Sequence, residues 1–178
     1  MIRTLTTLAT LVALAVSAPA LAQTADPRPA DVASPEAIVE AGYAAIAHEP
    51  GQGFDWDRFR TLFLPEARLI PNTEQRQGSF DVLTVEEFIA WIEAVSPAPG
   101  SANDQGFVEE QISAEVVRYG DVAHVFSTYQ KRFWGSDEIL GRGINSFQLV
   151  LHDGRWWIAG VVWDEEDGAG PIPAEYLE

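Results

Sequence analysis

The chain has 178 residues, of which 27 are acidic and 11 basic, so its formal net charge at pH 7 is −16. A surface this acidic repels nucleic acids and anionic membranes, and we expect neither as a partner. The chain has no cysteine, which excludes disulfides, thiolate metal sites and thiol catalysis, so a packed core must supply the stability.

The first 22 residues are typical of a secretory signal peptide. Arg3 supplies one positive charge, an apolar run over Leu8–Val16 follows, and Ala20-Leu21-Ala22 is a small-x-small cleavage site. Because the apolar run is short and Pro19 follows it, a signal peptide is favoured over an uncleaved membrane anchor. We therefore expect export to the periplasm or the medium, cleavage near Ala22-Gln23, and a mature chain that is not attached to a membrane.

The mature chain is expected to consist of a disordered lead-in over residues 23–33 and a single domain over residues 34–178. The lead-in is polar and contains prolines, which disfavour regular structure. The domain begins with Ser34-Pro35-Glu36, which combines an N-cap, a proline at the first helical position and an acid in the first turn. This pattern predicts a helix that runs to about Ala47.

Two further helices are predicted before the first long strand. Asp55 can cap a short helix that ends at Leu64-Pro65. Thr84 and Glu87 form a capping box, which predicts the start of a third helix, and Ser96-Pro97 ends it. Between these two helices the sequence predicts a short strand, Ala67–Ile70, and a polar segment, Thr73–Phe80, that forms either a loop or a weak edge hairpin.

From Gly106 onward the sequence changes to long strands. The two-residue turns Gly120-Asp121 and Asp153-Gly154 indicate two consecutive antiparallel hairpins, because such loops require backbone conformations that glycine and aspartate tolerate. Helices therefore come first and strands follow as a run. This order predicts an α+β fold, with three N-terminal helices packed in the concave face of a curved, mainly antiparallel sheet.

The turns also set the register of each hairpin, because side chains along a strand alternate between its faces. Counting back from the first turn pairs Ile112 with Tyr129, and counting from the second turn pairs Asn145 with Val162. A five-residue loop over Gly135–Ile139 would place Tyr129 beside Asn145 on the inner face. A four-residue loop would reverse that face.

The second hairpin is apolar on both faces, so each face must be covered. The inner face carries Phe147 and Val162 and is expected to form the core and a pocket, with Asn145 and Asp164 close together at its far end. The outer face carries Trp157 and Trp163 and is a candidate subunit contact. His124 is expected on the same outer side.

These elements resemble the nuclear-transport-factor-2-like superfamily, which includes the SnoaL-like polyketide cyclases and ketosteroid isomerase. The resemblance is carried by DWDRFRTLFLPEARLI, TVEEFIAWI, RYGDVAHVFSTYQ, GRGINSFQL and DGRWWI, which together span roughly Ser34 to Asp164. It implies a cystatin-like cone in which a curved sheet wraps the helices around an apolar pocket. It also implies a homodimer formed by the back of the sheet.

The resemblance suggests roles for the polar residues in that pocket. Enzymes of this kind use a carboxylate as the base and hydrogen-bond donors to hold an enolate, which would make Asp164 the base and Tyr129 and Asn145 the donors. The alternative is that all three are structural or solvated. Tyr43 and Trp91, on the first and third helices, would line the pocket with Phe147 and Val162.

Other charged and ligating residues receive a structural interpretation. Asp55 is interpreted as a helix cap and Asp57 as a solvated side chain, and the alternative is that both lie at the pocket mouth of a cone-shaped fold. Glu110 is expected opposite Lys131 as a cross-strand charge pair on the inner face. The three histidines are scattered, and no phosphate-binding loop is present, so we expect neither a metal nor a cofactor.

Three functions remain open from the sequence. The first is an exported protein that binds a small apolar molecule in a cone-shaped pocket. The second is a cofactor-independent isomerase or lyase with Asp164 as its base. The third is a structural dimerisation domain whose pocket is merely core. The superfamily hosts enzymes and binders alike, so the fold by itself does not choose among them.

Overall fold

The structure is a computed structural model, and it describes residues 26–71, 81–100 and 104–178. The predicted signal peptide, residues 23–25 of the lead-in and the loop Thr73–Phe80 lie outside the described residues. No helix in the described ranges is long and apolar enough to cross a bilayer.

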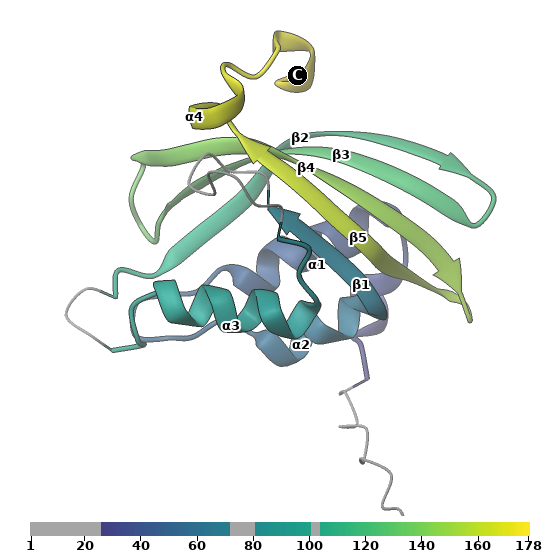
Figure 1. The fold of residues 1–178 in the computed structure, drawn as a ribbon, viewed down its shortest axis with the longest axis horizontal. Helices are drawn as coiled ribbons and strands as arrows, with labels where there is room; N and C mark the ends of the chain where they lie inside the picture. Colours follow the sequence, from purple (N-terminus) through teal and green to yellow (C-terminus); the bar gives the residue numbers. More distant parts are fainter. Residues whose placement is uncertain (1–25, 72–80, 101–103) are drawn as a thin grey trace, which may run out of the picture.

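The architecture is a curved sheet with helices against its concave face (Figure 1). The strands are ordered β1-β5-β4-β3-β2, and every pair is antiparallel except the parallel pair β1–β5. This arrangement confirms the predicted α+β class. The strands are β1 (Phe63–Pro71), β2 (Phe107–Tyr119), β3 (Val122–Phe133), β4 (Ile139–His152) and β5 (Arg155–Glu165).

The three helices begin where their caps predict. α1 (Pro35–Ile46) is capped by Ser34, α2 (Trp56–Leu62) by Asp55, and α3 (Val85–Val95) by Thr84, whose side chain accepts from the Glu87 amide in a complete capping box. Each cap satisfies an amide that has no partner inside its helix, which stabilises the helix by about 1 kcal/mol.

The core lies between α1, α2 and the concave face of the sheet. Ile38 and Val39 of α1, Leu62 of α2 and Ile158 of β5 are fully buried there. Burial of each such side chain contributes about 1.5–3 kcal/mol, so this layer holds the helices against the sheet. Polar and aromatic side chains beyond this layer do not take part in these contacts, and they line a cavity instead.

β1 begins directly after α2, at Phe63, which is four residues earlier than the predicted start at Ala67. Pro65 therefore lies inside a strand, where it cannot donate a backbone hydrogen bond. It is tolerated because β1 is an edge strand and its pairing with β5 is irregular between Phe63 and Arg68.

Both predicted hairpin turns are confirmed. Gly120 has φ 57°, and Asp153 and Gly154 have φ 50° and 76°, which is the left-handed geometry that a two-residue hairpin loop requires. Next to each turn the predicted pairs form, for example Ala114 with Ser127 and Leu149 with Ile158. Farther from each turn, the observed pairs differ from the predicted ones by one residue, for the same reason in both hairpins.

Each hairpin contains a β-bulge that shifts the pairing by one residue. In β2 the extra residue is Ile112, so Gln111 rather than Ile112 pairs with Tyr129. In β5 the extra residue is Ala159, so Asn145 pairs with Trp163 rather than with Val162. Because side chains alternate with a period of two, each bulge moves every side chain that lies beyond it, counted from the hairpin turn, to the face opposite the predicted one.

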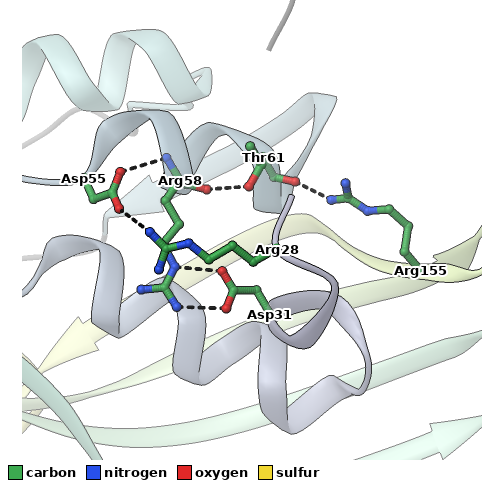
Figure 2. Close-up of polar contacts among 6 residues, drawn as sticks. All are labelled: Arg28, Asp31, Asp55, Arg58, Thr61 and Arg155. Carbon is green, nitrogen blue, oxygen red and sulfur yellow. Dashed lines mark hydrogen bonds and ion pairs between the residues drawn. The ribbon is translucent and has the colours of Figure 1, made fainter. Parts of the chain in front are cut away.

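The predicted lead-in is ordered from Pro29 onward, which corrects its assignment as disordered. Pro29–Val32 forms the 3-10 helix η1, and Asp31 is buried against α2 (Figure 2). The Arg58 guanidinium donates two hydrogen bonds to the Asp31 carboxylate, at 2.7 and 2.9 Å. A local sequence pattern could not reveal this ion pair, because Asp31 and Arg58 are 27 residues apart in the chain.

A second arginine ties α2 to the sheet. Arg155, at the start of β5, donates to the backbone carbonyl of Thr61, the penultimate residue of α2 (Figure 2). That carbonyl has no partner within α2's own hydrogen-bond pattern, because it belongs to the last turn. The two arginines therefore fix α2 from both sides, through η1 and through β5.

The C-terminal segment packs on the convex side of the sheet, opposite the three helices (Figure 1). It comprises α4 (Glu166–Ala169) and η2 (Ala174–Tyr176). The hydroxyl of Thr128 donates to the Tyr176 carbonyl at 2.6 Å, and the Tyr176 ring meets Phe126 edge-on at 5.0 Å. These contacts place the segment across the convex face of β3, and its last residue reaches the edge strand β2, where the Ser113 hydroxyl donates to the Glu178 carbonyl at 2.7 Å.

The Asp31–Arg58 pair gives a stability prediction. The Arg58 guanidinium lowers the pKa of Asp31, so the pair stabilises the fold above the ordinary pKa of a carboxyl group and loses that effect as the pH falls through the lowered value. We expect Asp31→Asn to reduce the free energy of unfolding by about 2 kcal/mol at pH 7, and by much less at pH 3, in urea titrations. Asp57→Asn, which breaks an exposed ion pair with Arg60, is the control, and an equal loss there would contradict the prediction.

Candidate functional site

A cavity of about 340 Å³ opens between the concave face of the sheet and the three helices. This size suits a small organic molecule. Tyr43 of α1, Trp91 of α3 and Phe147 of β4 line it, as does the end of β5. The cavity has two chemically different walls, one aromatic and one polar.

The aromatic wall is a connected series of rings from α2, α3 and β5. Phe88 stands at its centre: it stacks on Phe59 at 5.6 Å and meets Trp163 edge-on at 5.9 Å. Phe54 and Trp56 extend the series toward the mouth, with ring centroids 4.6 Å apart. Such offset and edge-on contacts fix the rings relative to one another, so the wall is preformed.

The polar wall contains a chain of hydrogen bonds across α1, β2, β3 and β4. The Asn145 amide donates to the Tyr43 hydroxyl at 3.0 Å, and Ser127 donates to the Gln111 side chain at 2.9 Å. Because the Ser127 hydrogen is used for Gln111, the Tyr43 hydroxyl donates its own hydrogen to Ser127, at 2.7 Å. The chain is therefore directional, and it ends on a carbonyl oxygen.

A second polar group surrounds Glu165 at the end of β5. The Lys131 ammonium donates to both of its carboxylate oxygens at 2.6 Å, and the Tyr129 hydroxyl donates to one of them at 3.2 Å. Gly143 makes room for this arrangement, because a Cβ there would lie 2.5 Å from the Tyr129 hydroxyl oxygen. The Glu165 carboxylate is thus paired with an ammonium group and held by two side chains of β3, across the intervening strand β4.

Glu109 of β2 lines the cavity between these two groups. It accepts a long hydrogen bond, 3.5 Å, from the Asn145 amide. Burial raises the pKa of Glu109 to about 7, although the nearby Lys131 charge opposes the rise. Glu109 therefore exchanges its proton near neutral pH, which an ordinary glutamate does not.

The two tyrosines keep their protons under the same conditions. Burial is the largest cause that raises the pKa of Tyr43 and of Tyr129, and the charge of Glu109 raises both further. They remain neutral hydroxyl groups throughout the physiological range. Burial therefore brings the pKa of Glu109 near pH 7, whereas it moves the pKa values of the two tyrosines farther from it.

The bulge in β5 corrects three residue assignments. Asp164 was expected in the pocket, but it pairs with Ile144 on the convex side, and Glu165 takes its place. Val162, expected to line the pocket, is likewise turned outward and is 43% exposed. Trp163, expected at a subunit contact, instead lines the cavity. All three reversals follow from the single extra residue Ala159.

The bulge in β2 corrects a fourth assignment. Glu110 was expected to pair with Lys131 on the inner face, but Glu109 is the residue opposite Lys131. Glu110 instead forms an ion pair with Arg132 on the other face of the sheet, at 3.2 Å. Phe107 and Glu109 consequently face the cavity.

The remaining site predictions have mixed outcomes. Tyr129 and Asn145 lie on the inner face as expected, but Tyr129 pairs with Gly143 and Asn145 with Ser127, so they are neighbours along a diagonal. Asp55 caps α2, and Asp57 forms an exposed ion pair with Arg60. The catalytic roles suggested for Tyr129 and Asn145 stay predictions.

The two other residues assigned to a subunit contact lie on the convex side. His124 shares a hydrogen bond with Ser146 at 3.0 Å, and the Arg155 guanidinium lies 3.5 Å above the Trp157 ring. The C-terminal segment covers the neighbouring part of this face at Phe126. Self-association through the uncovered part stays a prediction.

Sequence reasoning missed Glu109, Glu165 and Lys131 as a group. Gly160, inside a strand pattern, was a usable signal for the β5 bulge, because a glycine there often marks a bulge or a close backbone approach. A Cβ at Gly160 would lie 3.2 Å from the Arg68 carbonyl oxygen. The β2 bulge at Ile112 has no comparable signal, since its neighbours alternate regularly.

Comparison with known proteins supports the fold. No family model matches the sequence, and no curated protein matches it significantly. An NTF2-like protein of unknown function from Pseudomonas putida is 13% identical, with a TM-score of 0.54 over 80% of this chain and 88% of that one. The chain has the NTF2-like fold.

Two other solved structures are similar in fold to this chain. A protein of unknown function with a cystatin-like fold, from Nostoc punctiforme, is 13% identical, with a TM-score of 0.52 over 74% of this chain and 92% of that one. The CamKII hub homology domain of Chlamydomonas reinhardtii is 15% identical, with a TM-score of 0.53 over 72% and 92%. At these identities the similarity concerns the fold and not the activity.

The raised pKa of Glu109 predicts how stability depends on pH. The folded state holds this proton up to about pH 7, whereas an unfolded glutamate releases it near pH 4.5. The folded state therefore binds more protons between these values, and the contribution of Glu109 to stability falls as the pH rises from about 5 to 8. We expect a fall on the order of 1–3 kcal/mol, measured by urea unfolding.

The matched control for this measurement is Glu109→Gln, which keeps the shape of the side chain but cannot ionise. We expect the free energy of unfolding of this variant to change less between pH 5 and 8 than that of the wild type. Parallel profiles for the two proteins would show that Glu109 titrates normally, and would contradict its placement in a desolvated wall.

Proposed function

We propose that this protein is exported and binds a small, largely apolar molecule in its cone-shaped cavity. The observation that supports binding is the cavity of about 340 Å³, preformed by an interlocked aromatic wall and bordered by a few polar groups. Small-molecule sites typically have this composition, with apolar area for affinity and few polar atoms for orientation. The proposal of export rests on the sequence of residues 1–22.

The aromatic wall sets the shape of the ligand. Phe88, Trp163 and Trp56 present ring faces and edges from separate elements, so a flat or compact hydrocarbon body can contact several at once. A core that had no ligand to bind would gain stability by filling this space, since an empty apolar volume forfeits packing contacts. This cost argues against the purely structural alternative.

Binding can be tested with N-phenyl-1-naphthylamine, a neutral dye whose fluorescence rises in apolar surroundings. We expect saturable 1:1 binding with a micromolar dissociation constant. Ile92→Trp should weaken it by at least about tenfold, because Ile92 lines the cavity and the larger side chain would fill it.

Val95→Trp is the matched control for this experiment. Val95 lies on the same helix but is 66% exposed, so the added ring should leave the affinity unchanged. Circular dichroism would confirm that both variants fold. Equal affinities in the two variants would show that the dye binds elsewhere, and would count against the cavity as a binding site.

A second candidate function, acid–base catalysis without a cofactor, is favoured by one observation. Glu109 lines the cavity and has a pKa of about 7, so it can both accept and return a proton at neutral pH. It replaces Asp164, whose side chain lies on the other face of the sheet. In this function Glu109 would remove a proton next to a carbonyl group of a bound ligand.

Hydrogen exchange tests this second function. Small cyclic ketones incubated with the protein in deuterium oxide should gain deuterium next to the carbonyl group, as measured by NMR or mass spectrometry. We expect the rate above background to fall by at least about 100-fold in Glu109→Gln. A rate equal in both proteins would remove Glu109 from such chemistry and leave the binding function alone.

A further inference from the structure

The charges that line the cavity are unbalanced. Among the described residues, three carboxylates line it (Asp104, Glu109 and Glu165), against the single ammonium of Lys131. Asp104, at the mouth, is held by backbone amides of Gly51, Gly100 and Gly106, which lower its pKa and keep it ionised. The carboxylates that line the cavity therefore outnumber its ammonium group three to one.

The one ammonium is committed to one of these carboxylates. Lys131 donates to both oxygens of Glu165 at 2.6 Å, and the Tyr129 hydroxyl supports the same carboxylate. Lys131 acts on Glu109 only through its charge, while the bond that Glu109 accepts from Asn145 is long, 3.5 Å. When Glu109 is ionised, its charge is poorly compensated by the wall around it.

The hydroxyl groups of the wall have no hydrogen left for a ligand. Tyr43 donates to Ser127, Ser127 donates to Gln111, and Tyr129 donates to Glu165. A hydroxyl has one hydrogen, so each of these donors is used inside the protein. What the wall presents to the cavity is mainly acceptor oxygen, and above all the carboxylate of Glu109.

The opposite wall also favours positive charge. Aromatic faces attract cations through their negative electron clouds, by about 0.5–2 kcal/mol for each well-placed ring, and tryptophan is the strongest. Trp56, Trp91 and Trp163 all line the cavity. An aromatic wall and a poorly compensated carboxylate in one cavity are an arrangement that suits an ammonium group with an apolar body.

We infer that the ligand of this cavity is a small organic cation, an ammonium compound with a hydrocarbon body, whose charge lies between the tryptophan wall and Glu109. This inference rests on the proposed binding function and specifies the ligand class of the same site. The protein holds the ligand by charge on one side and by apolar contact on the other, and no bond is made or broken.

The test uses two probes of the same shape. Benzyltrimethylammonium carries a positive charge at every pH, and neopentylbenzene has a carbon in place of the nitrogen. Binding is measured by tryptophan fluorescence at pH 8. We expect the cation to bind at least about tenfold more tightly, a difference of 1.4 kcal/mol. Because the probe does not titrate, any pH dependence of its affinity belongs to the protein.

The affinity for the cation should fall at least about fivefold between pH 8 and pH 5.5, as Glu109 gains a proton, whereas that for neopentylbenzene should not change. The groups that face Glu109 are Tyr43 of α1, Tyr129 and Lys131 of β3, Asn145 of β4 and Glu165 of β5, with His48 and Asp104 at the mouth. His48 is a second ionisable side chain at this cavity, so His48→Gln should retain the fall if Glu109 causes it.

Two glutamate variants locate the charge. At pH 8, Glu109→Gln should weaken cation binding about tenfold and leave neopentylbenzene within about twofold. Glu110→Gln, which alters the neighbouring residue on the opposite face, should change neither.

Each result has a defined meaning. Equal affinities for the two probes would overturn the cation inference and leave the binding function standing. Tighter binding of the cation that does not depend on Glu109 would also overturn it. Failure of both probes, and of the neutral dye, to bind would overturn the binding function as well.

Discussion

A β-strand places successive side chains on opposite faces, and the content of the cavity depends on where that alternation is interrupted. One extra residue in β2, Ile112, turns Glu109 inward, and one extra residue in β5, Ala159, turns Trp163 and Glu165 inward. Without these bulges the cavity would have other carboxylates in other places. The bulges also bend the strands, so the same two residues help to make the sheet concave.

The features that the sequence predicts correctly are local. Helix caps at Ser34 and Thr84 and the hairpin turn at Asp153 involve residues within a few positions of one another, so their physical causes lie in short stretches of sequence. The α+β class follows from the order of these elements. The pocket residues Tyr43, Trp91 and Phe147 were also predicted from the sequence. No bulge lies between any of them and the cap or turn that fixes the position of its helix or strand.

What the sequence could not show is non-local. A bulge is stabilised by the curvature of the whole sheet and by contacts such as that of Gly160 with Arg68, neither of which is visible from one strand. A register error of one residue then exchanges Asp164 for Glu165 and Glu110 for Glu109. The ion pair of Asp31 with Arg58 was missed for the same reason, since it joins segments that are distant in the chain.

The bulge at Ile112 lies on the last strand of the sheet, where it affects how the protein meets other copies of itself. β2 is 13 residues long, and an unbroken edge of that length would be a template for strand addition and aggregation. Ile112 interrupts the edge near its middle, and Ser113 binds the carbonyl of Glu178 beside it. The residue that brings Glu109 to the cavity is therefore also an irregularity in an exposed edge, and such irregularities are one means by which proteins disfavour edge-to-edge pairing.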